Sequence, residues 1–170
     1  MKQYTLFYSW QSDRKDVKNI IKTAINKTKK TLKNEGIELL VDEDTRDRTG
    51  NKEIVREVLD KIEKCDIFLA DVSPVTTLDD TTGEELPKHM PNSNVMFEYG
   101  YAQHCKGEGR IITLAKIEKG QYKQCMPFDI NHNTLTTFKT AADLSHLSDW
   151  IKNIIVEVDK ERANIVPDLL

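Results

Sequence analysis

The sequence has little of what builds disulfide frameworks, zinc sites or glycine-rich phosphate loops. Its three cysteines are an odd number without C-x-x-C spacing, which argues against both a disulfide framework and a zinc site. Only seven glycines occur in 170 residues, and no glycine-rich turn follows the first strand-like segment, so a dinucleotide site of that type is a poor match. The cysteine usage indicates a reducing compartment.

The sequence also lacks an excess of one charge and any long hydrophobic run. Lys and Arg number 25 against 28 Asp and Glu, a formal charge of −3, and neither a basic excess nor an acidic tail is present. No apolar run approaches membrane-spanning length, and the N-terminus leads into a strand-like segment without a signal-type stretch. We therefore expect a cytoplasmic protein that binds neither nucleic acid nor membrane.

What is present is an alternation of strand-like and helix-like segments. Short apolar runs predict strands at 4–9, 37–41, 66–72, 110–115 and 135–138. Helical periodicity predicts helices at 16–34, at about 52–64, around Glu98 and at 144–162. We expect one domain over residues 1–170, with a core at about 4–138 and a closing helix at about 144–162. The predicted fold is α/β, three-layered and doubly wound, with a mostly parallel five-stranded sheet in the order 2-1-3-4-5.

Polar residues mark the ends of the predicted elements. Ser12 or Asp13 is placed to cap the helix at 16–34, and Gly36 stands where a helix C-terminus usually has a glycine. Residues 73–90 form a long polar insertion after the third predicted strand.

In an open parallel sheet of this order, ligands bind beyond the carboxyl ends of the strands, where the strand order reverses. Segments 9–13 and 71–73 and the start of the Glu98 helix are delivered to that place, and residues 42–51 lie near enough to form a wall or lid. A receiver domain would also carry an aspartate where Asp71 stands. Its metal site, however, needs an acidic pair where this first strand ends in Ser9 and Trp10.

Glu98 is the one formal charge between Lys88 and Lys106. It lies at the edge of the helical face formed by Val95, Tyr99 and Ala102. A carboxylate in that position is expensive to bury, so it must be paired, hydrogen-bonded or used.

A fixed carboxylate in a dry pocket can stabilise or trap the oxocarbenium-like sugar cation that forms when an N-glycosidic bond breaks. The other interpretation of Glu98 is a buried structural carboxylate paired with Arg46 or with backbone amides. From this residue alone, both interpretations are open.

Several segments together resemble a known family. They are F-Y-S-W-Q-S-D at 7–13, D-V-S at 71–73, P-N-S-N-V-M-F-E-Y-G-Y-A at 91–102 and P-F-D-I at 127–130. Their order and spacing resemble the bacterial TIR-like (Toll/interleukin-receptor type) domains, over roughly residues 4–137. The piece E-Y-G-Y-A at 98–102 is similar to the E-L-G-Y-A segment of nucleoside deoxyribosyltransferases, a related fold in which the glutamate is the nucleophile.

The resemblance implies a flavodoxin-like fold and, in the catalytic branch, cleavage of NAD⁺ between nicotinamide and ribose. Glu98 maps onto the essential glutamate of that branch, and NAD⁺ is then the substrate, with no metal or separate cofactor required. A role in bacterial antiviral or stress signalling is also implied. Two alternatives remain open: an enzyme of the nucleoside or nucleotide deoxyribosyltransferase type, and a non-catalytic TIR interaction module.

The resemblance also implies substrate contacts. Ser9 and Asp13 match the loop that borders the nucleotide, and Trp10 offers a stacking face. The complete set of predicted substrate-binding residues is Ser9, Trp10, Asp13, Asp71, Arg46 and Tyr99.

Two further segments have implied roles. Residues Asp42 to Asn51 correspond to the loop that mediates head-to-tail assembly and gates the pocket, which predicts self-association through this loop. The insertion at 73–90 is longer than the family minimum and is a candidate lid or partner surface. Tyr99 stands where the transferase-like segment usually has Leu, which leaves the shape of the sugar pocket open.

Overall fold

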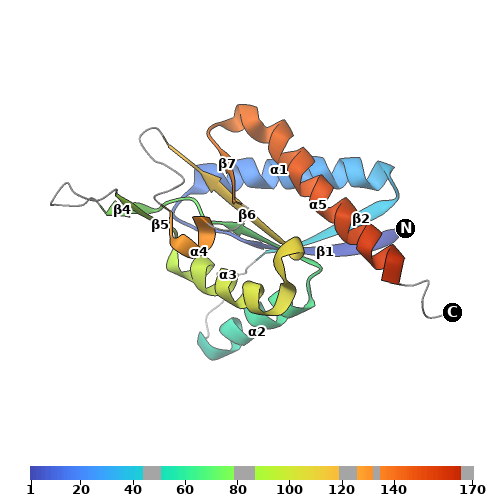
Figure 1. The fold of residues 1–170 in the computed structure, drawn as a ribbon, viewed down its shortest axis with the longest axis horizontal. Coiled ribbons are helices and arrows are strands. Elements are labelled where there is room, and N and C mark those ends of the chain that lie inside the picture. Colours follow the sequence, from blue (N-terminus) through green and yellow to red (C-terminus); the bar gives the residue numbers. More distant parts are fainter. Residues whose placement is uncertain (44–50, 79–86, 119–125, 132–134, 166–170) are drawn as a thin grey trace.

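A computed structural model describes residues 1–43, 51–78, 87–118, 126–131 and 135–165. Among these residues, five strands form one sheet in the order β2-β1-β3-β6-β7, and all neighbouring strands are parallel (Figure 1). The strands are β1 (Lys2–Ser9), β2 (Ile37–Glu43), β3 (Ile67–Asp71), β6 (Ile111–Lys116) and β7 (Leu135–Phe138). This is the predicted flavodoxin-like α/β fold, with strand order 2-1-3-4-5 and the last strand at the sheet edge.

Helices cover both faces of the sheet and make the fold three-layered (Figure 1). One face carries α1 (Lys15–Asn34) and α5 (Leu144–Ile165), and the other carries α2 (Asn51–Lys64) and α3 (Ser93–Lys106). Side chains alternate along β1, so Leu6 and Tyr8 pack under α1 and α5 while Phe7 packs toward α2 and α3. We call these the α1–α5 face and the α2–α3 face.

None of the described helices resembles a membrane span. The longest, α1 and α5, have 20 and 22 residues and carry charged side chains along their length. Within the described ranges, no helix combines the length and the hydrophobicity needed to cross a membrane.

Several short elements have no counterpart in the prediction. The insertion at 73–90 contains an antiparallel hairpin, whose strands are β4 (Thr76–Leu78) and β5 (Lys88–Met90). The other short elements are the helix α4 (Phe128–Asn131) and two 3₁₀ turns, η1 (Glu108–Arg110) and η3 (Ala141–Asp143). Elements of three or four residues are too short to show a periodicity, so the pattern of the sequence does not reveal them.

The two ends of α1 differ in how well they were predicted. The N-cap residue is Arg14, and no side chain caps the helix, so the prediction that Ser12 or Asp13 caps it is wrong. Asp13 instead accepts a hydrogen bond from Asn92, which lies on another element. Gly36 follows the C-cap residue with φ +82°, a left-handed conformation that suits glycine, and its role at the helix end is confirmed.

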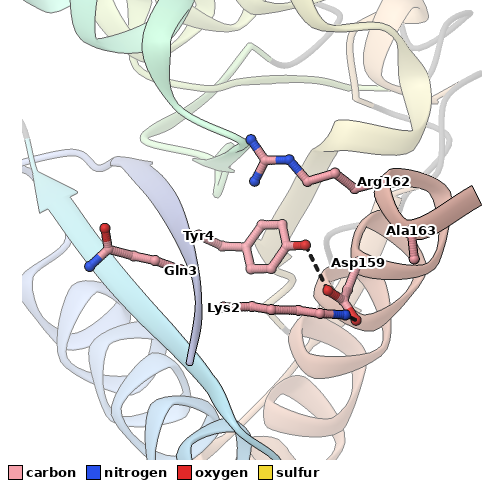
Figure 2. Close-up of a pocket in the computed structure, with 6 residues that line it drawn as sticks. All are labelled: Lys2, Gln3, Tyr4, Asp159, Arg162 and Ala163. Carbon is pink, nitrogen blue, oxygen red and sulfur yellow. Dashed lines mark hydrogen bonds and ion pairs between the residues drawn. The ribbon is translucent and has the colours of Figure 1, made fainter. Parts of the chain in front are cut away.

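At the amino edge of the sheet, the start of β1 meets the end of α5 around a cavity of about 280 Å³ (Figure 2). The Tyr4 hydroxyl donates a hydrogen bond to Asp159 Oδ1 at 2.7 Å, and Lys2 Nζ lies 2.9 Å from Asp159 Oδ2. The Arg162 guanidinium lies 5.4 Å from the centroid of the Tyr4 ring. Because these groups satisfy one another, the cavity marks a structural junction between the first strand and α5.

Gly36 and Gly100 offer a matched pair of substitutions. A Cβ atom at either position would meet no described atom within 4 Å, so only the backbone distinguishes the two sites. Gly36→Ala should lower the free energy of unfolding by about 1 kcal/mol, because alanine is strained at positive φ. Gly100→Ala, on the exposed side of α3, should raise it by about 0.5–1 kcal/mol, because glycine is a poor residue in a helix interior. Urea denaturation of both variants checks the pair, and a destabilised Gly100→Ala would contradict the assignment of this position to open helix surface.

Candidate functional site

Ser9 and Glu98 meet at the carboxyl end of β1, on the α2–α3 face. Glu98 lies about one and a half turns into α3 and is only 5% exposed. The Ser9 hydroxyl, at the last position of β1 and fully buried, donates a hydrogen bond to Glu98 Oε2 at 2.5 Å. The carboxylate therefore has the polar partner that its burial requires, and two of the predicted site residues are in direct contact.

The start of α3 fixes the helix that carries Glu98. The Asn92 side chain caps it, because Asn92 Oδ1 accepts hydrogen bonds from the backbone N–H groups of Asn94 and Val95 at 2.9 and 3.4 Å. Asn92 Nδ2 donates to Asp13 Oδ2 at 2.7 Å. Asp13 therefore lies at the helix start in this structure, tied to the cap of α3.

The loop after β1 is also attached to the segments that follow β3 and β6. Gln11 is buried, and its Nε2 donates to the carbonyl oxygen of Ser73 at 2.9 Å. Arg14 donates from Nη1 to the Pro74 carbonyl at 3.1 Å and from Nη2 to Glu118 Oε1 at 2.6 Å. These contacts hold the loop against the carboxyl edge of the sheet.

Four charged side chains surround the outer side of this loop. Lys116 Nζ lies 2.8 Å from Asp16 Oδ2 and 3.1 Å from Glu118 Oε1, and Arg14 also contacts both acids. The hydrogen bond from Lys116, with help from Arg14, lowers the pKa of Asp16 to about 2. The cluster therefore stays ionised at neutral pH and compensates its own charge.

Asp71 does not lie beside Glu98. Ala70 is in register with Ser9 and shares its face, so by strand alternation Asp71 projects toward the α1–α5 face, like Ile67 and Leu69. The predicted meeting of segments 9–13 and 71–73 is real, but the sheet separates the Asp71 carboxyl group from the Glu98 carboxylate.

Asp71 belongs to a buried polar network of its own. Its Oδ1 accepts hydrogen bonds from the backbone N–H of Ser73 at 3.0 Å and from the Ser73 hydroxyl at 2.6 Å. Ser73 Oγ in turn accepts one from the backbone N–H of Lys116 at 2.8 Å, which joins the end of β3 to the end of β6.

This network contains buried polar atoms that lack partners. Among the described residues, Asp71 Oδ2, Gln11 Oε1 and the Tyr8 hydroxyl have no hydrogen-bond partner. Burial raises the pKa of Asp71 to about 6, against the opposing effect of the Ser73 hydroxyl and amide. Burial likewise raises the pKa of Tyr8 well above its ordinary value, and the negative charge of Asp71 adds to that rise. A proton on Asp71 thus relieves part of the cost of burying this cluster.

Trp10 is half-buried and Tyr99 is buried. The Trp10 ring lies against the core of the α1–α5 face, with Lys18 Nζ 2.9 Å from its centroid. Tyr99 is buried in the core of the α2–α3 face, and its hydroxyl accepts a hydrogen bond from Gln103 Nε2 at 2.8 Å. Neither placement tests the predicted contact with substrate, so both stay predictions.

The remaining predicted site residue, Arg46, lies outside the described residues, as do positions 44–50 of the predicted assembly loop. The described acidic residues of that loop pair within the chain: Asp42 with Lys61 at 3.2 Å and Glu43 with Lys22 at 2.8 Å. In the part of the chain that the structure describes, no group of three or more His, Cys, Asp or Glu side chains gathers as a metal site would.

Sequence reasoning missed three buried polar residues near the carboxyl edge. Gln11 and Ser73 lie within the segments that carry the family resemblance, so their place in the sequence could have identified them. His89, almost fully buried in β5, has its Nδ1 3.0 Å from the Thr77 hydroxyl, on the facing strand of the hairpin. Nothing in the sequence pointed to His89, because the hairpin itself was not predicted.

Asp71→Asn should make the protein more stable at neutral pH. The folded-state pKa of about 6 exceeds the ordinary 3.8, so between these values the folded protein binds more protons than the unfolded chain. Stability therefore falls as pH rises from about 4 to 6, and the loss stays constant above that range. Two pKa units correspond to about 3 kcal/mol.

Denaturation of wild type and Asp71→Asn between pH 4 and 8 checks this prediction. The variant should match the wild type near pH 4 and exceed it increasingly up to about pH 6, because asparagine retains the acceptor for Ser73 without a buried charge. A difference that does not change with pH would contradict the raised pKa.

Comparisons with known proteins place the chain in a family. No curated protein matches its sequence. Among solved structures, the CMP N-glycosidase BcmB of Clostridium botulinum is similar, with 15% identity and a TM-score of 0.45 over 84% of this chain and 97% of that one. A 2-deoxyribosyltransferase from Leishmania mexicana is also similar, with 16% identity and a TM-score of 0.48 over 84% of this chain and 98% of that one.

The family model described as "CAP12/Pycsar effector protein, TIR domain" matches residues 20–140. This range is the greater part of the chain and includes Glu98 and Asp71, whereas Ser9 and Asp13 precede it. The match agrees with the TIR-like segments found in the sequence and with the parallel sheet order of the structure. The chain therefore belongs to the TIR domain family of the CAP12/Pycsar effector proteins.

Proposed function

We propose that this protein is an NAD⁺ nucleosidase of the TIR type, a glycohydrolase or cyclase that cleaves the bond between nicotinamide and ribose. The observation that supports this most is the Glu98 carboxylate, which is 5% exposed and held by the Ser9 hydroxyl at 2.5 Å at the carboxyl edge of the sheet. Ligands of open parallel sheets bind at that edge. Membership of a TIR effector family supports the same assignment.

The chemistry needs a fixed negative charge more than it needs a proton donor. When the bond between ribose C1′ and the pyridinium nitrogen breaks, both electrons go to the nitrogen, so nicotinamide leaves as a neutral molecule. The ribose becomes an oxocarbenium-like cation, which Glu98 stabilises in surroundings of low dielectric constant. Water then attacks C1′ and releases a proton, or a nucleophilic atom of the same substrate closes a ring. NAD⁺ is the substrate, and the scheme uses no metal or separate cofactor.

Within this scheme Ser9 holds the catalytic carboxylate in place. Its hydroxyl sits at the end of a strand that is paired on both sides, so the hydrogen bond restricts the rotamer of Glu98. Trp10 follows Ser9 directly, and we keep it as the proposed stacking surface for the substrate. Arg46, Asp71 and Tyr99 remain proposed substrate contacts on the family resemblance alone.

We also propose the setting of this activity. The family is one of effector proteins, which supports a role in bacterial antiviral or stress signalling. Self-association through Asp42 to Asn51 would then control when the site works. The described end of this loop carries charged side chains that already form ion pairs within the chain, and these pairs would have to rearrange if the same charges met a second copy.

Glu98→Gln should abolish nicotinamide release while the fold survives. The amide has the same shape and can still accept the Ser9 hydrogen bond through its oxygen, but it lacks the charge that the sugar cation needs. We expect a loss of at least about 100-fold. Ser9→Ala should lower turnover by about tenfold, because one hydrogen bond to a charged group is lost. Chromatography of concentrated protein incubated with NAD⁺ measures both.

Glu157→Gln is the matched control, since Glu157 is an exposed glutamate on α5 that pairs with Lys160 within the same helix. It should release nicotinamide at the wild-type rate. Circular dichroism and thermal unfolding of each variant confirm that the proteins are folded. If the wild type exchanges bases between nucleosides and does not cleave NAD⁺, the protein is an enzyme of the deoxyribosyltransferase type and our proposal fails. If neither activity occurs even at high concentration, the domain is an interaction module.

A further inference from the structure

Besides the contact of Glu98 with Ser9 at the end of β1, the Glu98 helix is attached to the loop after β1. Asn92 uses both ends of its side chain: Oδ1 caps α3, and Nδ2 donates to Asp13 Oδ2 at 2.7 Å. Asp13 follows the end of β1 by four residues and does not cap its own helix, α1. Asp13 instead accepts a hydrogen bond from Asn92, which lies 79 residues further along the chain.

We propose that Asp13 and Asn92 are positioning residues that set the depth at which Glu98 meets Ser9, an inference that rests on the proposed function of Glu98. The helix α3 runs without interruption from Ser93 to Lys106, so its first turn and Glu98 move as one body (Figure 1). Buried Val95, Tyr99 and Ala102 hold the body of α3 against the α2–α3 face of the sheet. The hydrogen bond between Asn92 and Asp13 adds a polar attachment at the helix start, on the side of Ser9 and the loop that follows it.

The charge of Asp13 suits this position in two ways. A carboxylate near the N-terminus of a helix interacts favourably with the helix dipole. A hydrogen bond from an amide to a carboxylate is also shorter and stronger than one between neutral groups, and the distance of 2.7 Å agrees with that. Asp13 is exposed, so it can hold the helix without the cost of burying a second charge beside Glu98.

This arrangement gives Asp13 a role that differs from the predicted one, and enzyme kinetics can distinguish the two. The family resemblance predicts that Asp13 borders the nucleotide, whereas its hydrogen bond in the structure is to the cap of α3. A positioning residue acts on turnover through Glu98, so its loss should lower kcat more than it raises KM. A direct contact with the substrate should chiefly raise KM.

An exchange of the two side chains separates positioning from simple helix capping. Asn92→Asp keeps the cap, because aspartate is as good an N-cap residue as asparagine, but it sets a second carboxylate against Asp13. Asp13→Asn keeps an acceptor for Asn92 Nδ2. The double variant Asp13→Asn/Asn92→Asp restores one donor and one acceptor with their positions reversed. Asn94→Asp is the control, since Asn94 is exposed in the same first turn and receives the same added charge.

We expect kcat for nicotinamide release to fall about tenfold in Asn92→Asp with KM little changed, as for the loss of one hydrogen bond together with carboxylate repulsion. Asn94→Asp should stay within about threefold of wild type. Asp13→Asn keeps a weaker, neutral hydrogen bond, so its kcat should fall less than that of Asn92→Asp, and the double variant should recover to at least the level of Asp13→Asn. Full activity of Asn92→Asp, or a double variant as impaired as Asn92→Asp, would overturn the proposal. A rise in KM with unchanged kcat would do the same and return Asp13 to the substrate.

Urea unfolding of the same variants keeps this test independent of the proposed function. The two positions should be coupled in stability, with Asn92→Asp destabilised and the double variant restored. If the positions are not coupled, the positioning proposal fails even when NAD⁺ is cleaved. If they are coupled but the wild type releases no nicotinamide, the contact is real, and its catalytic purpose fails together with the proposed function.

Discussion

The hydrogen bond between Ser9 and Glu98 is the constraint on which the carboxyl edge of this sheet depends. Glu98 is buried, and a carboxyl group removed from water needs hydrogen-bond donors from the protein. Ser9 can meet Glu98 only if β1 and α3 keep a fixed spacing. The loop after β1 supplies that stiffness. Gln11 and Arg14 contact the segment after β3, Asp13 contacts Asn92, and Arg14 also contacts Glu118 after β6. The loop thereby joins the ends of β3 and β6 to the start of α3.

The sheet divides this edge into two polar regions with different chemistry. On the α2–α3 face, Glu98 and Ser9 form a compact hydrogen-bonded pair. On the α1–α5 face, Asp71 has a raised pKa and a carboxyl oxygen without a described partner. Ser73 links the second region to β6 through the backbone of Lys116. A buried carboxyl group with one oxygen unpaired lowers the free energy of unfolding, and an apolar residue in its place would cost less. Packing alone therefore does not explain Asp71, and this second region is a place where the protein is less stable than it could be.

The sequence predicted those features that depend on repeated local patterns. The alternation of apolar strands and amphipathic helices was enough for the layers and the strand order, and the isolated charge of Glu98 was enough to single out its helix. The misses depend on contacts distant in sequence. Asp13 was predicted to cap α1, but its hydrogen bond is with Asn92. The face that Asp71 occupies, which the sequence left open, follows from the register of β3 with β1. Three-residue strands such as β4 and β5 carry too little pattern for any local rule to find them.

The junction between β1 and α5 bears on how the chain is made. Tyr4 and Lys2 are held by Asp159, and α5 contributes Leu147, Ile151, Ile155 and Val158 to the core that also contains Leu6 and Leu69. On a translating ribosome the first strand emerges early and this helix emerges late. Until then, one whole face of the central strands has no cover except α1, so the nascent chain exposes apolar surface over most of its synthesis. The native packing of this face is therefore completed only after α5 has been synthesised, because β1 and the helix that helps to cover it lie at opposite ends of the described residues.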